Sequence, residues 1–276
     1  MTDYSFLIST VFVALFTSIS CGVIGTYVVN RRIVFIAGGV THASFGGIGA
    51  GYFFGINPIL GAAFFAVLSA FGIEGLTKKM KLRNDSVIAM VWAFGMAVGI
   101  IFVYITPGYA PNLMSYLFGS ILTVSSSELM FLMILTFSII IVFVLFFKPI
   151  QYIAFDEGYL KTISFPLKFF NSLLTILLAL TIVLNIKTVG IILLLSLLTI
   201  PQNIASLLTM NFKNLLIYSS VIAFSASIAG LAGAYFLNIP AGATIVFILV
   251  IIFLIVKSIS WIRVPIKKDG NLHKEI

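Results

Sequence analysis

Long apolar runs without charged residues dominate this chain and leave it few ways to fold. Between Ile33 and Ile73 there is no Lys, Arg, Asp or Glu, and similar runs recur along the sequence. Hydrophobic residues make up 61% of the 276 and charged residues only 9%, whereas a soluble domain is about half apolar and about a quarter charged. We therefore expect one polytopic, all-α membrane domain over residues 1–276.

The number of membrane crossings follows from the length of these runs, since a spanning helix needs about 20 apolar residues. On this measure the sequence predicts nine transmembrane helices. They cover residues 6–29, 33–54, 57–76, 86–106, 128–147, 167–186, 189–210, 214–237 and 241–260. Turn-forming residues at 55–58, 210–213 and 238–240 predict hairpins between neighbouring spans.

The basic residues predict the orientation. With nine spans, 15 of the 16 Lys and Arg residues lie on one side of the membrane, and only Lys187 lies on the other. The positive-inside rule makes the crowded side cytosolic, so the N-terminus is outside and the C-terminus inside. A cleaved signal peptide is excluded for residues 1–30, because no basic region precedes the run and Arg31 and Arg32 follow it.

Three segments outside the spans are longer than turns. Residues 106–127 form an outer connection with an amphipathic run, and residues 148–166 form a polar inner connection. Residues 262–276 are a charged cytosolic tail that we expect to be disordered. The net charge of +8 is spread between the apolar runs, which indicates membrane topology and not nucleic-acid binding.

His42 is a titratable side chain within the second apolar run. An ionisable group at membrane depth is costly and indicates a functional site, and imidazole is the commonest transition-metal ligand among side chains. Small residues surround it on two adjacent rows of the predicted helix. The rows hold Gly39, Ala43, Gly47, Gly51 and Gly55, and then Gly38, His42, Gly46 and Ala50.

Two interpretations of this stretch stay open from the residues alone. Small residues let helices pack closely in lipid, and a histidine there can hydrogen-bond to a neighbouring helix. Alternatively, the bare face lines a solute pathway, with His42 as a ligand and Gly38, Thr41 and Gly46 beside it.

The seventh span contains a second polar cluster. Pro201 removes a helix hydrogen bond and predicts a kink, and Gln202 and Asn203 follow it directly. Two amides in a span are too costly to face lipid, so they face either another helix or a translocation path.

Several chemistries are excluded by what the sequence lacks. The single cysteine, Cys21, forms neither an intramolecular disulfide nor a zinc cluster. There is no G-x-x-x-x-G-K-[ST] loop and no H-E-x-x-H motif. The chain is thus not expected to be an enzyme or to hydrolyse ATP itself, and active transport would need a partner or an ion gradient.

Five blocks in sequence order, within residues 6–260, resemble the permease subunits of bacterial ATP-binding-cassette importers for zinc, manganese and iron. They are residues 40–47 (VTHASFGG), 117–125 (LFGSILTVS), 155–166 (FDEGYLKTISFP), 189–201 (VGIILLLSLLTIP) and 239–246 (IPAGATIV). The first is similar to the family's Asp-Ala-x-Ser-His-Ala-x-x-Pro-Gly block, and the third to its Phe-Asp-x-x-x-Ala-x-x-x-Gly-x-Pro loop.

The resemblance implies a multi-pass permease of the bacterial cytoplasmic membrane that pairs with a second copy of itself. It further implies two cytosolic ATPase subunits and an extracytoplasmic metal-binding protein as partners, a divalent metal ion as substrate, and no permanently bound cofactor. Residues 148–166 become the segment that couples to the ATPase, with Phe155, Asp156, Glu157 and Lys161 as its contact residues.

The chain departs from the family pattern near His42. The family's Asp aligns with Gly38, its Pro-Gly with Gly46-Gly47, and its Ala-Ala after Pro201 with Gln202-Asn203. Manganese suits carboxylates, whereas imidazole suits zinc, copper, nickel and iron, so the sequence favours zinc. We hypothesise that Gln202 or Asn203 supplies the lost oxygen ligand.

Two other functions compete with this interpretation. A secondary transporter would use His42 as a proton relay and need no ATPase. A membrane scaffold would tolerate replacement of His42, Gln202 and Asn203 together.

Overall fold

The structure is a computed structural model, and it describes residues 2–80, 83–107, 119, 124–162 and 164–263. Within these ranges all regular structure is helical, as the sequence predicted. The helices are α1 (Thr2–Asn30), α2 (Val34–Phe53), α3 (Pro58–Met80), α4 (Asn84–Ile105), α6 (Ser126–Leu145), α7 (Phe147–Phe155), α8 (Glu157–Thr162), α9 (Leu167–Leu197), α10 (Ile200–Leu208), α11 (Phe212–Leu237) and α12 (Ala241–Arg263).

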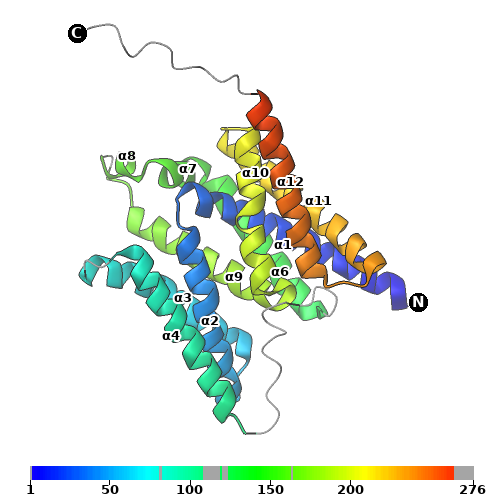
Figure 1. Ribbon diagram of the computed structural model, residues 1–276. Coiled ribbons are helices and arrows are strands. Elements are labelled where there is room, and N and C mark those ends of the chain that lie inside the picture. Colours follow the sequence, from blue (N-terminus) through cyan, green and yellow to red (C-terminus); the bar gives the residue numbers. More distant parts are fainter. Residues whose placement is uncertain (1, 81–82, 108–118, 120–123, 163, 264–276) are drawn as a thin grey trace, which may run out of the picture.

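The helices form two groups joined by α9 (Figure 1). In one group, α2 packs against both α3 and α4. In the other, α1 packs against α6 and α11, while α12 packs against α10 and α11. Helix α9 contacts α1, α2 and α3, so it connects the two groups through a shared apolar core.

Glycines bring α2 unusually close to its neighbours. A Cβ on Gly47 would lie 2.0 Å from the carbonyl oxygen of Gly61 in α3, and one on Gly49 would lie 2.4 Å from that of Gly99 in α4. Real Cβ atoms do not approach backbone so closely, so only glycine fits at these positions. Most of the small-residue face therefore packs helix against helix, which is how small residues stabilise membrane bundles.

Seven stretches of the described chain are long and apolar enough to cross a membrane, judged by length and composition. The predicted span 33–54 is present as α2, but it falls outside this set. The predicted spans 167–186 and 189–210 lie within one stretch, Leu167–Leu208. The count of nine spans and the orientation of the termini therefore stay predictions.

The Leu167–Leu208 stretch is not one straight helix. Its 42 residues would extend about 60 Å, twice the hydrocarbon thickness of a bilayer. Gly190 interrupts α9 with φ 79° and ψ 164°, a conformation that other residues rarely adopt. A second break follows at Thr199, and Pro201 lies in the first turn of α10, where its missing N–H costs nothing. The break falls just before the kink predicted at Pro201.

The predicted turns are present. Gly55 (φ 66°) lies between α2 and α3, and Asn238 (φ 53°) ends α11 in the left-handed conformation. Asn211 caps α11, because its side-chain oxygen accepts hydrogen bonds from the N–H groups of Lys213 and Asn214. The amphipathic run expected within 106–127 and most of the 262–276 tail lie outside the described residues.

The glycine contacts generate a stability prediction. Gly47→Ala should destabilise the protein by about 1–3 kcal/mol, because the new methyl group overpacks the α2–α3 contact. Gly38→Ala is the matched control on the same helix, since a Cβ there meets no atom within 4 Å. Thermal unfolding of the purified protein in detergent measures both. Equal melting temperatures for the two variants would contradict the packing described for α2.

Candidate functional site

His42 occupies an unusual place on α2. From Ala37 to Gly51, every residue of this helix is buried except His42, which is partly exposed. His42 is therefore the one residue of this stretch that is not fully enclosed.

The surroundings of His42 divide the pathway candidates into two kinds. Gly38, one turn before His42, borders open space, because a Cβ there would meet nothing within 4 Å. Gly46, one turn after it, is packed, since a Cβ would lie 2.9 Å from the Gly95 carbonyl oxygen. Thr41 is fully buried, and its hydroxyl donates to the Ala37 carbonyl within the helix. Of the three, only Gly38 has room for an added side-chain atom.

The imidazole of His42 is held by an aromatic ring and not by hydrogen bonds. The indole of Trp92 in α4 stacks on it, with ring centroids 3.9 Å apart and planes 9° from parallel. Nδ1 of His42 is buried and has no hydrogen-bond partner among the described residues. This geometry does not match the interpretation of His42 as a histidine bonded to a neighbouring helix.

The two amides after Pro201 point to different surroundings. Gln202 is 2% exposed, and its Nε2 donates to the carbonyl oxygens of Cys21 and Leu197 at 2.9 Å each. It fits because Gly25 of α1 has no side chain; a Cβ there would lie 2.3 Å from Nε2. Asn203 is exposed and donates to the Thr199 carbonyl oxygen at 2.7 Å.

The structure does not bring these amides to the histidine. No hydrogen bond joins Gln202 or Asn203 to His42 in the described part of the chain. Oε1 of Gln202 is buried without a partner there, whereas Asn203 lines a cavity of about 220 Å³ beside α12, with Ile200, Val250 and Phe253. Gln202 joins α10 to α1, which is the interhelical role left open by the sequence. The role of Gln202 or Asn203 as an oxygen ligand beside His42 stays a prediction.

The segment at 148–166 folds as two short helices. Helix α7 ends at Phe155, whose ring packs edge-on against Phe212. Asp156 separates the helices, and its carboxylate accepts a hydrogen bond from the Tyr159 N–H of α8 at 3.1 Å. Phe155 and Tyr159 remain about half exposed, so this amphipathic segment presents aromatic and charged side chains together.

Arg31 ties this segment to the bundle. Its guanidinium donates to the Glu157 carboxylate, the Tyr27 hydroxyl and the Asn171 side-chain oxygen, each at 2.8 Å. These partners belong to α8, α1 and α9 respectively, so one cation joins three helices. Lys161 adds a weaker ion pair with Glu157 at 3.6 Å. The sequence placed Arg31 only as a topology residue.

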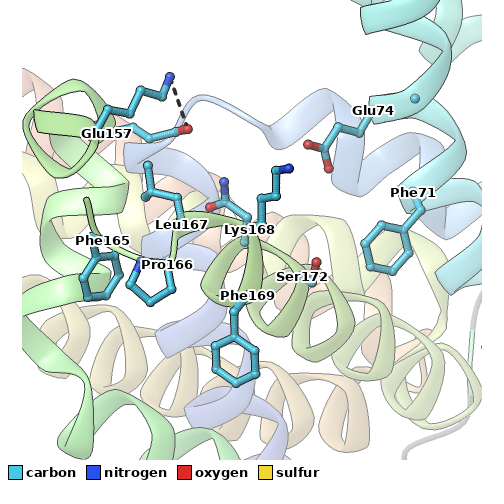
Figure 2. A pocket seen from close by; sticks show the side chains of 12 residues that line it. Phe71, Glu74, Glu157, Phe165, Pro166, Leu167, Lys168, Phe169 and Ser172 are labelled. Atoms are coloured by element: carbon cyan, nitrogen blue, oxygen red, sulfur yellow. Dashed lines mark ion pairs between the residues drawn. The ribbon is translucent and has the colours of Figure 1, made fainter. Parts of the chain in front are cut away.

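A cleft of about 1040 Å³ opens beside this junction, at the end of the bundle that the positive-inside rule assigns to the cytosol. Glu74 of α3 and Glu157 of α8 lie on opposite sides of it, with Lys168 of α9 between them (Figure 2). The side chains of Phe71 and Phe165 form an apolar part of the wall of this cleft. A movement of α8 would therefore reshape a cavity that reaches α3 and α9.

An ion pair also joins helix ends on the opposite side of the bundle. Glu128 caps α6 in a reciprocal hydrogen-bonding arrangement with Ser125, and it pairs with Lys187, the single basic residue that the sequence placed outside. The sequence assigned Glu128 no role, and its role here is structural.

No group of three or more His, Cys, Asp or Glu side chains is arranged to hold a metal ion within the described residues. His42 is therefore not part of such a group in the described part of the chain.

The chain is thus a bundle with several helices of membrane-spanning length, with His42 on α2 and an amphipathic segment next to Arg31. The sequence profile described as the ABC 3 transport family matches residues 3–260. The chain belongs to this family, the permeases of metal ATP-binding-cassette transporters.

Individual proteins agree with this assignment. An uncharacterized membrane protein of Synechocystis is 38% identical over 92% of this chain and 90% of its own length. The manganese transport system membrane protein MntC of Listeria monocytogenes is 31% identical over 92% of this chain and 91% of its own. Among solved structures, a chain of PsaBC from Streptococcus pneumoniae in complex with Fab matches with a TM-score of 0.84 and 28% identity, over 92% of this chain and 91% of that one.

The Arg31 junction yields a second prediction. Arg31→Ala and Glu157→Gln should each destabilise the protein, and a double-mutant cycle should give a coupling energy of about 1 kcal/mol, because the pair is partly buried and charged. The cycle is measured by thermal unfolding in detergent. Lys161→Ala is the control: the side chain of Lys161 is 67% exposed, so its coupling to Glu157 should be only a few tenths of a kcal/mol. Additive effects of the Arg31 and Glu157 changes would refute the junction.

Proposed function

We propose that this chain is the membrane-spanning subunit of an ATP-driven importer of a divalent transition-metal ion. Two copies enclose the pathway, two separate ATPase subunits supply energy, and an extracytoplasmic protein delivers the ion. The observation that carries the proposal is His42, a partly exposed imidazole without a hydrogen bond in the otherwise buried stretch 37–51 of α2. The relatives named for metal transport support it.

The energetics of His42 favour a function over a packing role. A buried polar atom without a partner costs about 1–3 kcal/mol, and Nδ1 is such an atom. An apolar residue would fill the same volume without this cost. Imidazole is a good ligand for transition metals. Contact with a passing metal ion is therefore a function that explains why this free-energy cost is tolerated.

The segment 148–166 is the proposed contact with the ATPase. Its exposed aromatic rings, Phe155 and Tyr159, can enter an apolar groove of a partner. Arg31 then transmits the movement of α8 to α1 and α9 through the contacts with Glu157, Tyr27 and Asn171. A movement that starts at the ATPase thereby reaches α9. Helix α9 packs against α2, the helix that carries His42.

Zinc is the proposed substrate. Gly38 stands where the resembling permeases have an aspartate, and the space beside it is open. An imidazole without a carboxylate suits zinc better than manganese, which prefers oxygen ligands. The relative from Listeria monocytogenes is named for manganese transport, which favours manganese as the substrate. The transported metal is therefore measured directly.

Replacing His42 tests the pathway. His42→Ala should lower zinc uptake by about tenfold or more in chelator-limited cells, in line with the loss seen when groups that support metal sites are removed. The control is His273→Ala, which changes the other histidine of the chain. Cellular metal content, measured for zinc, manganese and iron, gives the result. Normal uptake by His42→Ala cells would overturn the role of this residue.

The energy source is tested in the same strains. The purified permease should bring down a P-loop ATPase, and Phe155→Ala together with Glu157→Arg should release it. A gradient-driven transporter would instead copurify with no ATPase and lose uptake when an ionophore collapses the proton gradient. That outcome would replace the proposed function with the secondary-transporter alternative.

Selectivity can be tested at Gly38. Gly38→Asp should improve manganese uptake relative to zinc by about tenfold, because it places a carboxylate one helical turn from His42, where oxygen ligands favour manganese. The open space at this position accommodates the side chain. Gly38→Asn is the matched control, with the same shape and no charge. An equal shift in both variants, or none in Gly38→Asp, would contradict the ligand argument.

A further inference from the structure

The contact between His42 and Trp92 is the closest parallel stack of rings in the described structure. The centroids are 3.9 Å apart and the planes differ by 9°. The two helices that carry the rings are locked together by backbone contacts nearby, since a Cβ on Gly95 of α4 would lie 2.4 Å from the Cα of Ala43 in α2. The position of the indole relative to the imidazole is therefore set by rigid helix packing.

Metal-binding histidines are usually oriented through their second nitrogen, which donates to a carboxylate, a carbonyl or a water molecule. In His42 that device is missing, because Nδ1 is enclosed and no described residue bonds to it. Without another restraint the ring could rotate about its bond to Cβ, since this torsion has broad minima. The indole face of Trp92 supplies the restraint.

We propose that Trp92 is a positioning residue for His42, stacking on the imidazole so that the unenclosed edge of the ring, with Nε2, meets the permeating metal ion. This inference rests on the proposed function of His42. It adds a residue on another helix to the site. The indole also favours the metal-bound state directly, because a metal-bound imidazole is more positive and the face of an indole attracts positive charge.

The exposure of Trp92 supports this role over simple core filling. Its side chain is 39% exposed, so it does not fill a closed space in the core. Phe94, two residues further along α4, is 68% exposed and has no recorded ring contact with His42. The two aromatics on one helix therefore differ in their relation to the imidazole, which makes Phe94 a matched control.

Uptake kinetics test the proposal in the full transporter. Trp92→Ala should raise the half-saturating zinc concentration by about tenfold, the lower end of the effect of losing a supporting group at a metal site. Trp92→Phe should restore most of the affinity, because a phenyl ring can still stack. Phe94→Ala should match the parent. Abundance in the membrane and assembly with the ATPase are measured for each variant, so that a folding defect is recognised.

Tryptophan fluorescence gives a second readout, which reports whether a metal ion binds beside the stacked indole. The chain has two tryptophans, and Trp261→Phe leaves Trp92 as the only one. In this background Co²⁺, a paramagnetic ion, should quench the emission saturably, since a metal on the imidazole lies beside the stacked indole. Adding His42→Ala should abolish the saturable quenching. If Trp92→Ala folds poorly, the quenching measurement can still contradict the positioning role of Trp92, because it uses the intact ring pair.

The outcomes separate this inference from the proposed function. If His42→Ala loses uptake while Trp92→Ala and Trp92→Phe both keep the parent's half-saturating concentration, the positioning role is wrong and the metal pathway stands. Failure of Co²⁺ to quench Trp92 in a transport-active chain likewise overturns it. If His42→Ala itself transports normally, the proposed function fails first, and the role of Trp92 fails with it.

Discussion

The close packing of α2 against α3 and α4 is the constraint on which the rest of the site depends. Glycine at positions 47 and 49 lets backbone meet backbone across both interfaces. In lipid there is no hydrophobic effect between helices to compensate for a poor fit, so van der Waals contact of this kind must hold them. It buries the middle of α2, residues 37–51, and leaves His42 as the one partly exposed residue of that stretch.

The sequence predicted which helices and turns this structure contains better than it predicted their arrangement. Charge-free runs of membrane length have one physical outcome, so the helices and their turns at Gly55 and Asn238 were predictable. The histidine could be singled out because a titratable group in such a run is costly. The break at Gly190 lies beside the boundary predicted between the spans 167–186 and 189–210. The merging of α9 and α10 into one apolar stretch shows that the length of apolar runs alone does not count membrane crossings.

The contacts that define the site were not predictable from one amino-acid sequence. Trp92 lies far from His42 in sequence, and a tryptophan in an apolar helix has many ordinary uses. The small-residue rows offered packing and pathway as alternatives, and only the structure divides them, with Gly46 packed and Gly38 open. Gln202 and Asn203 are adjacent in sequence yet face different surroundings, because neighbours on a helix point about 100° apart.

The close packing around His42 also connects this residue to the rest of the bundle. Close backbone contacts hold α2 against α3 and against α4. Helix α9 touches α2 and α3 on one side and α1 on the other, and Arg31 fastens α8 to α1 and α9. Under the proposed function, a displacement of α8 would reach the three-helix group through α9 and move His42 and Trp92 with that group.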